Sequence, residues 1–359
     1  MDRDEPLTLV GPDGHRFGWH DGWAELPDDA ETRAGWAHHA LVTTRDGSVV
    51  GFHPADGTIV VRAPDGTVER TLHCGLIEGH GATIIEQEDG TEVLWVADAG
   101  FKMVPSHEAP TGYGPRTQPG GPAAADLPGA LAGARGRVLA VGLSDGRIVT
   151  ELPTPQHERY DHRPFLPTAV AAAPDGTVWV ADGYGASMLH RFAPDGRQLR
   201  SITGEESAAG PLRVPHGLLI DRRHGKPELY VADRENRRLV VLDVEGEFLR
   251  EVAPGQLERP CAMAVHGDLL AVAELRARVA LLDLDDRLVG TLGANTRVAD
   301  VAGWPNGLDD GTAVRPAELT PGRFHAPHGI TTDVAGNLYV AEWLIGGRYT
   351  KLVPVARAD

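Results

Sequence analysis

Residues 215–233 read PHGLLIDRRHGKPELYVAD, and two other stretches of the chain repeat this arrangement. Residues 79–98 begin GHGATI and end LWVAD, and residues 327–342 begin PHGITT and end LYVAE. Each stretch has an apolar run, a polar turn and a second apolar run that ends in an acid, which is the pattern of a β-hairpin. The units between them begin LPTAVA and RPCAMA, with Thr168 and Cys261 in place of the histidine. Histidines therefore open alternate units of a longer repeat.

The repeat predicts a closed ring of small sheets. Asp-Gly pairs between apolar runs mark hairpin turns, because the turn needs a positive φ angle that glycine adopts easily. They stand at residues 46–47, 65–66, 89–90, 145–146, 175–176 and 195–196. A period of roughly 40–50 residues with about four short strands is typical of a propeller blade. We therefore expect an all-β fold, a six-bladed β-propeller, with blades that begin near Ala37, Gly79, Leu166, Val214, Arg259 and Ala326.

The last unit contains only three obvious strands. We expect an N-terminal segment, either Leu7–Val10 or Arg16–His20, to pair as its missing outer strand, which would close the ring and hide two sheet edges. A single propeller accounts for all 359 residues, so we expect one domain over residues 1–359. Residues 105–135 interrupt the second unit with a Pro-, Gly- and Ala-rich insertion, which is either a flap over the axial pocket or a disordered loop. A second irregular stretch, Asn295–Pro321, could cover the same mouth.

The composition of the chain argues against several classes of binding partner. A net charge of −17 argues against nucleic acid or an anionic membrane as a partner. No apolar run reaches the ~18 residues of a membrane span, and the N-terminus lacks a secretion signal pattern. The two cysteines, Cys74 and Cys261, have no metal-ligand spacing. We therefore expect a cytoplasmic protein that acts on a small molecule, while its oligomeric state stays open.

The histidines predict a metal site. In a six-membered ring, alternate blades are related by a threefold rotation, so His80, His216 and His328 would point at one spot on the axis. Three imidazoles in this arrangement can hold a catalytic divalent metal with coordination positions left open. Four further residues are expected to contact substrate: His38 and His39 open the first blade, and Glu342 and Trp343 stand close to the last histidine.

The segment Phe165–Glu251 resembles the peptidyl-α-hydroxyglycine α-amidating lyase domain of the enzymes that amidate peptides. The shared motifs, in order, are D-G-Y at 182–184, G-E-E-S at 204–207, V-P-H at 214–216 and A-D-R-E-N at 232–236. They are more specific than a generic NHL-type propeller repeat. The family carries a zinc ion on the propeller axis, which implies that His80, His216 and His328 bind zinc here. It also implies that Tyr184 is the catalytic base and Arg234 an active-site arginine.

The resemblance implies a lyase that splits a carbinolamide into an amide and glyoxylate. A tyrosinate beside positive charge can take the hydroxyl proton, and an arginine can pair a substrate carboxylate. Two positions depart from the family: Ala326 replaces a methionine, and Gly329 replaces an acid linked to a structural calcium, so calcium is not expected. We therefore expect a small polar metabolite as the substrate. Two alternatives stay open: a metal-dependent epimerase or isomerase that removes a proton α to a carbonyl, and a non-catalytic scaffold.

Overall fold

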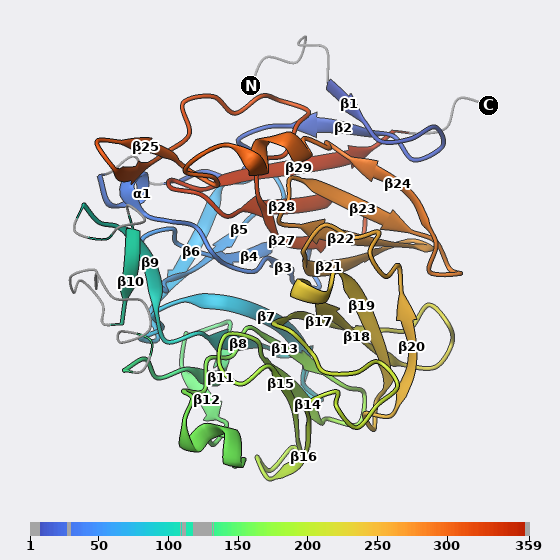
Figure 1. Cartoon of the computed structure of the whole chain (residues 1–359). Coiled ribbons are helices and arrows are strands. Elements are labelled where there is room, and N and C mark those ends of the chain that lie inside the picture. The colour runs from blue at the N-terminus through green and yellow to red at the C-terminus, as the bar shows by residue number, and fades with distance from the viewer. Residues whose placement is uncertain are drawn as a thin grey trace.

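Six antiparallel sheets surround a common axis (Figure 1). This computed structural model describes residues 8–26, 30–107, 109, 113–117, 131 and 133–355. The predicted six-bladed β-propeller is confirmed. In each blade the first strand lies nearest the axis, because residues of these six strands line one central cavity. None of the described helices is long and apolar enough to cross a membrane.

Five blades have four strands each, paired in chain order. Blade 1 contains β3 (Val42–Thr43), β4 (Val49–Phe52), β5 (Ile59–Arg62) and β6 (Val68–Leu72). Blade 2 contains β7 (Gly79–Glu86), β8 (Glu92–Asp98), β11 (Arg137–Gly142) and β12 (Ile148–Glu151). Blade 3 contains β13 (Ala169–Ala172), β14 (Val178–Asp182), β15 (Met188–Phe192) and β16 (Gln198–Ile202). Blade 4 contains β17 (Pro215–Asp221), β18 (Glu228–Asp233), β19 (Arg238–Asp243) and β20 (Phe248–Val252). Blade 5 contains β21 (Pro260–His266), β22 (Leu269–Glu274), β23 (Arg278–Leu282) and β24 (Leu288–Leu292).

Blade 6 is built from both ends of the described chain. Its inner strands are β27 (Pro327–Thr332), β28 (Leu338–Glu342) and β29 (Arg348–Pro354), and β2 (Phe17–His20) pairs with β29 as the fourth strand. A further strand, β1 (Thr8–Val10), pairs with β2 on the outside. Both candidate segments therefore join the blade, so the expected closure of the ring holds and a fifth strand is added.

Apolar side chains between neighbouring blades form the core. Separate buried clusters lie between each adjacent pair; the one between blades 4 and 5, for example, joins Tyr230 and Leu239 to Leu270 and Val272. The Asp-Gly turns form as predicted: Gly176 has a φ of 80°, and the Asp175 carboxylate accepts a hydrogen bond from the Thr177 N–H at 3.0 Å. Burial on both faces of the strands thus fixes six sheets around the axis.

Short elements cover the face on which the second strand of each blade ends, here called the upper face. They are α1 (Ala30–Ala34), the 3-10 turns η2 (Arg234–Asn236) and η3 (Thr296–Asp300), and two hairpins, β9 (Lys102–Pro105) with β10 (Tyr113–Arg116) and β25 (Gly307–Asp309) with β26 (Thr312–Val314). A further 3-10 turn, η1 (Glu158–Asp161), precedes blade 3. The hairpin of β9 and β10 thus spans the start of the insertion predicted at residues 105–135, of which residues 108, 110–112, 118–130 and 132 lie outside the described residues.

Candidate metal centre

The three predicted histidines occupy equivalent irregular positions in blades 2, 4 and 6. In each, the pairing of the first strand with the second shifts register at the histidine: between Gly79 and Gly81, between Pro215 and Leu218, and between Pro327 and Gly329. Such bulges re-aim a side chain away from the ordinary alternation of a strand. The ring centroids of His80, His216 and His328 lie 4.7, 4.8 and 4.9 Å apart, so the three rings form a nearly equilateral triangle.

A backbone carbonyl from the next blade orients each ring. The Nδ1–H of His80 donates to the Thr168 carbonyl at 2.6 Å, that of His216 to the Cys261 carbonyl at 3.0 Å, and that of His328 to the His39 carbonyl at 3.4 Å. This bond fixes the tautomer and leaves the Nε2 lone pair of each ring free, as in many metal sites. Thr168, Cys261 and His39 therefore serve one role: in blades 3, 5 and 1, the carbonyl of each orients the histidine of the preceding blade.

The same carbonyls explain the glycine after each histidine. A Cβ atom at Gly81 would stand 2.3 Å from the Thr168 oxygen, one at Gly217 2.2 Å from the Cys261 oxygen, and one at Gly329 2.5 Å from the His39 oxygen. Any side chain would push the orienting carbonyl away from the ring. Each histidine thus needs the glycine that follows it, because only glycine leaves room for the orienting carbonyl. The same steric reason applies to Gly329.

Tyr184 lies against the histidine nitrogens. It follows β14, and the Asp182 carboxylate holds its loop by accepting hydrogen bonds from the N–H groups of Leu166, Gly185 and Ala186. The Tyr184 Oη is 3.0 Å from the Nε2 atoms of both His80 and His216. The Arg234 guanidinium, from the start of η2, lies 3.4 Å from the same oxygen and above the phenol ring.

These contacts leave lone pairs that a cation can satisfy. A phenol has one hydrogen to donate, whereas His80 and His216 both present lone pairs to Tyr184. The Nε2 of His328 is buried and has no hydrogen-bond partner among the described residues. Four buried histidines, His38 included, offer nitrogen atoms that all lie within 4.8 Å of one another, so the cluster can hold a metal ion.

Burial sets the protonation of the cluster. It lowers the pKa of His80 to about 3 and lowers the pKa of His216 and of His328 well below the usual value. The rings are therefore neutral at physiological pH, which is the form that binds metals. Burial also raises the pKa of Tyr184 to about 12, although the nearby Arg234 opposes that rise. Without a cation at the histidines, the phenol stays protonated at neutral pH.

The four expected substrate contacts fall in different places. His38 lies inside the histidine cluster, and the ring of Trp343 stands beside it, with 5.5 Å between ring centroids. His39 does not reach the site: its Nε2 is 2.7 Å from the Tyr349 hydroxyl, where the ring is buried between blades 1 and 6. Glu342 is also buried away from it, because its carboxylate accepts hydrogen bonds from the N–H groups of His325 and Ala326 and pairs with Arg348.

Sequence reasoning missed a buried ion pair beside the cluster. The Lys102 ammonium donates to both carboxylate oxygens of Glu78, at 3.1 and 3.0 Å, and to the Trp36 carbonyl at 3.0 Å. Lys102 and Glu78 are fully buried. The pair links the backbone two residues before His38 to the residue two before His80. Lys102 lies just before the predicted insertion, at the start of a hairpin whose sequence shows no periodic pattern that could have pointed to it.

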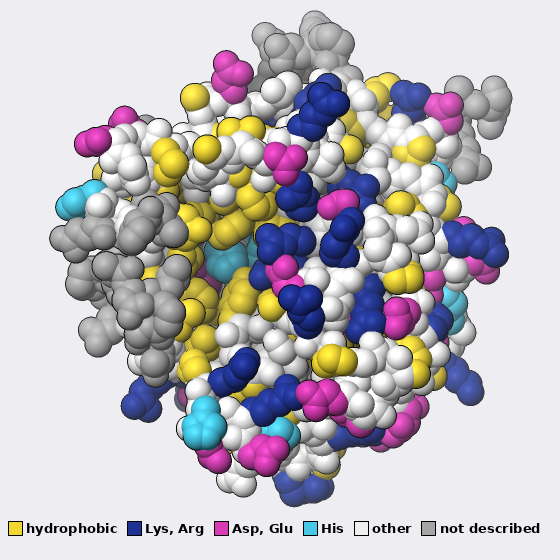
Figure 2. All heavy atoms as spheres, in the orientation of Figure 1, with side chains coloured by type: hydrophobic (Ala, Val, Ile, Leu, Met, Phe, Trp, Pro, Cys, Tyr) yellow, Lys and Arg dark blue, Asp and Glu magenta, His cyan; other side chains and the backbone are white. Residues whose placement is uncertain are grey.

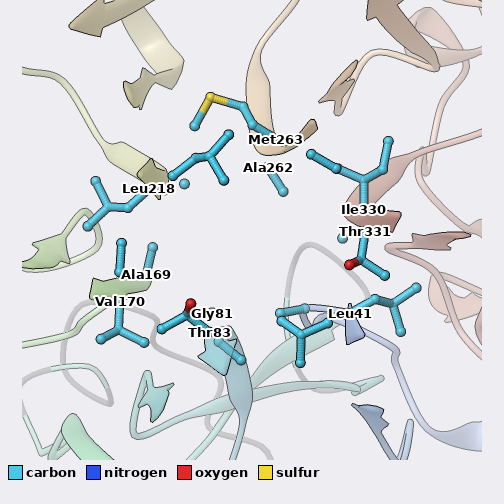
Figure 3. A pocket seen from close by; sticks show the side chains of 18 of the residues that line it. Leu41, Gly81, Thr83, Ala169, Val170, Leu218, Ala262, Met263, Ile330 and Thr331 are labelled. Atoms are coloured by element: carbon cyan, nitrogen blue, oxygen red, sulfur yellow. The ribbon is translucent and has the colours of Figure 1, made fainter. Parts of the chain in front are cut away.

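An axial cavity and a surface hollow both reach the histidines. A cavity of about 470 Å³ runs along the axis, with His80, His216 and His328 among its lining residues. Leu41, Leu218, Met263 and Ile330, from four different blades, stand around it (Figure 3). In the view of Figure 2 the molecule has a central hollow with histidine at its floor, hydrophobic side chains on one side and arginine or lysine side chains on the other.

The fold and the site together define a six-bladed β-propeller with a buried histidine cluster suited to a divalent metal. No protein-family model matches the chain, so the NHL assignment stays a prediction. Over 93 residues it is 38% identical to peptidyl-glycine alpha-amidating monooxygenase B of Xenopus laevis, which covers 24% of this chain and 10% of that protein. Over 111 residues it is 32% identical to peptidyl-alpha-hydroxyglycine alpha-amidating lyase 2 of Drosophila melanogaster, which covers 29% of this chain and 27% of that protein. The matches thus span about a tenth and about a quarter of these relatives.

Solved structures share the fold over nearly the whole chain. A streptogramin B lyase superposes with a TM-score of 0.52 at 13% identity and covers 94% of this chain and 98% of its own. A gluconolactonase from Xanthomonas campestris gives a TM-score of 0.52 at 15% identity, with 99% and 100% covered. At these identities the likeness concerns the fold alone.

Proposed function

We propose that this protein is a metal-dependent lyase that splits a small, polar, carboxylate-bearing carbinolamide into an amide and glyoxylate. The observation that carries the proposal is the position of Tyr184. Its Oη lies 3.0 Å from two histidine nitrogens and 3.4 Å from the Arg234 guanidinium. A base, a cation site and an anion partner therefore meet at one atom. The partial likeness to amidating enzymes supports the same chemistry.

His80, His216 and His328 would hold the metal, with zinc as the expected ion. When bound, a divalent cation supplies Lewis acidity and a positive charge that lowers the pKa of the neighbouring phenol. The Arg234 guanidinium pairs the substrate carboxylate with forked hydrogen bonds. Tyr184 would take the hydroxyl proton, the carbon–nitrogen bond would break as the carbonyl forms, and the same proton would pass from Tyr184 to the departing amide nitrogen. The reaction is not a redox step, so it needs no oxidant or reductant.

Apolar side chains border the site. Trp36, Phe101 and Met103 belong to one buried cluster, against which Tyr184 and Trp343 pack. The guanidinium of Arg234 is itself largely buried, which strengthens its interaction with an anion. This arrangement places one cationic group and an apolar wall at the same hollow, so the acyl part of the substrate lies along the wall.

The test is release of glyoxylate from N-acetyl-α-hydroxyglycine and N-benzoyl-α-hydroxyglycine by zinc-loaded protein. We expect glyoxylate from at least one of them, and the ratio reports whether the acyl pocket prefers a small polar or an aromatic group. His216→Ala protein is the blank. Glyoxylate release no faster than this blank for both substrates would contradict the lyase.

The same residues could serve an epimerase or isomerase, and one measurement separates the two. An isomerase would exchange the proton α to the carbonyl with solvent deuterium without cleaving the substrate. Deuterium uptake without glyoxylate would therefore replace the lyase by the isomerase. A scaffold would show neither reaction and would not need the bound metal.

A further inference from the structure

His38 stands in the metal cluster as closely as the three predicted ligands do. Its ring centroid is 4.5 Å from that of His80 and 4.5 Å from that of His328, so it lies over one edge of the histidine triangle. Its Nε2 is 3.1 Å from the Tyr184 Oη, which matches the 3.0 Å of His80 and His216. Seen from this oxygen, His38 occupies a position equivalent to those of two expected ligands.

The backbone on both sides of His38 is fixed from three directions. The Ala37 N–H donates to the Leu344 carbonyl of blade 6 at 3.1 Å, and the Ala40 N–H donates to the Gly79 carbonyl of blade 2 at 3.3 Å. The Trp36 carbonyl accepts from the buried Lys102 ammonium. Burial of a lysine and a glutamate is unfavourable unless both are well bonded. The ion pair thus holds the segments that carry His38 and His80 together.

His38 differs from the other histidines in one respect. Its Nδ1 is buried and has no hydrogen-bond partner among the described residues, whereas the other three rings donate to a carbonyl. A buried imidazole with an unpartnered nitrogen inside a cluster of nitrogen donors is placed to bind a cation.

We propose that His38 is a fourth metal ligand, so that this centre is held by four imidazoles from blades 1, 2, 4 and 6. The inference rests on the metal centre of the proposed function and extends it. Because no carbonyl orients the His38 ring, it is the least firmly held of the four ligands. It is therefore the ligand that an incoming substrate atom displaces, while the triangle of His80, His216 and His328 stays in place. A four-nitrogen set suits Zn²⁺, Cu²⁺, Fe²⁺ and Ni²⁺, which all accept imidazole.

The test counts imidazoles directly, by X-ray absorption spectroscopy of the Zn²⁺-loaded protein without substrate. We expect four imidazole nitrogens in the wild type and three in His38→Ala. The Zn²⁺ dissociation constant should rise at least about tenfold in His38→Ala, since even the loss of an outer partner of a ligand costs about 10–100-fold. His266→Ala is the matched control, because it removes a half-buried histidine that packs against Phe17, outside the cluster; it should keep four imidazoles and the wild-type affinity.

The outcomes separate this inference from the function on which it rests. Three imidazoles in the wild type, with an unchanged affinity in His38→Ala, would overturn the fourth ligand and leave the three-histidine centre intact. Failure of the wild type to bind Zn²⁺, Cu²⁺, Fe²⁺ or Ni²⁺ would overturn both. The wild-type imidazole count needs no variant, so the inference stays testable even if His38→Ala does not fold.

Discussion

Replacement of Tyr184 by phenylalanine removes one oxygen atom from the centre of the site. That oxygen lies within 3.1 Å of three histidine nitrogens and within 3.4 Å of Arg234, so its removal affects four neighbouring side chains at once. The ring and its packing remain. We expect kcat to fall by about 10²–10⁴, the usual worth of a general base. This corresponds to about 3–5 kcal/mol of transition-state stabilisation.

The size of this loss distinguishes a base from a packing residue. KM should change little, because the missing interaction belongs to the transition state. Bound zinc should be retained, since His80, His216 and His328 keep their orienting carbonyls. The matched control is Tyr230→Phe, which removes a hydroxyl in blade 4 that donates to Asp286 of blade 5. Its kcat should be that of the wild type.

The pH profile provides the stricter assay. A tyrosinate base makes the rate fall as the pH drops through the pKa of Tyr184 in the zinc-loaded enzyme. In the metal-free protein burial raises that pKa to about 12, so a functional base at neutral pH requires the added cation. Steady-state glyoxylate release between pH 5 and 9 should show this limb in the wild type and not in the variant. Near wild-type kcat in Tyr184→Phe, with the limb intact, would refute the reasoning and direct attention to His38.

His216→Ala should weaken zinc binding strongly and abolish activity but keep the fold, because the cores between blades bury most apolar surface; an unchanged zinc dissociation constant would show that His216 is not a ligand. Arg234→Gln should raise KM roughly 10- to 100-fold, the worth of a hydrogen bond between charged groups, without loss of zinc; an unchanged KM for the carboxylate substrate would count against its role. Metal-free protein should lose stability as pH falls, because folded His80 stays neutral down to about pH 3 while the unfolded chain takes up this proton near 6.5. Between pH 7 and 5.5 the loss is roughly 1 kcal/mol for this residue, and urea titrations should show a smaller loss in His80→Gln; equal losses would argue against a buried neutral ring.

The periodic part of the molecule could be predicted from the sequence. Alternating apolar residues and Asp-Gly turns report the same local physics in every blade, so the six blades, the closing segment and the alternate histidines all followed. The convergence of His80, His216 and His328 followed from the symmetry of the ring. Their roles in binding metal remain predictions.

The rest depends on contacts that no local pattern encodes. Blade 1 has no Pro-His-Gly motif, so the sequence could not tell which of two adjacent histidines faces the axis. The structure shows that His39 is the counterpart of Thr168 and Cys261, because its carbonyl orients His328. His38 then points into the cluster. The hairpin that carries Lys102 was hidden for a similar reason: its strands pair with each other and not with a blade.

The closure of the ring gives the metal a second consequence. β2 pairs with β29 inside blade 6, and this non-covalent pairing is the seam that closes the ring, because the chain itself continues from β2 into blade 1. His328 comes from one side of this seam, while His38 and His80 come from the other. A cation bound by all three histidines would link the two sides of the seam. At a free metal concentration of 100 times its dissociation constant, metal binding would stabilise the closed ring by about 2.7 kcal/mol. The ion would then stabilise the closed propeller in addition to its role in the reaction.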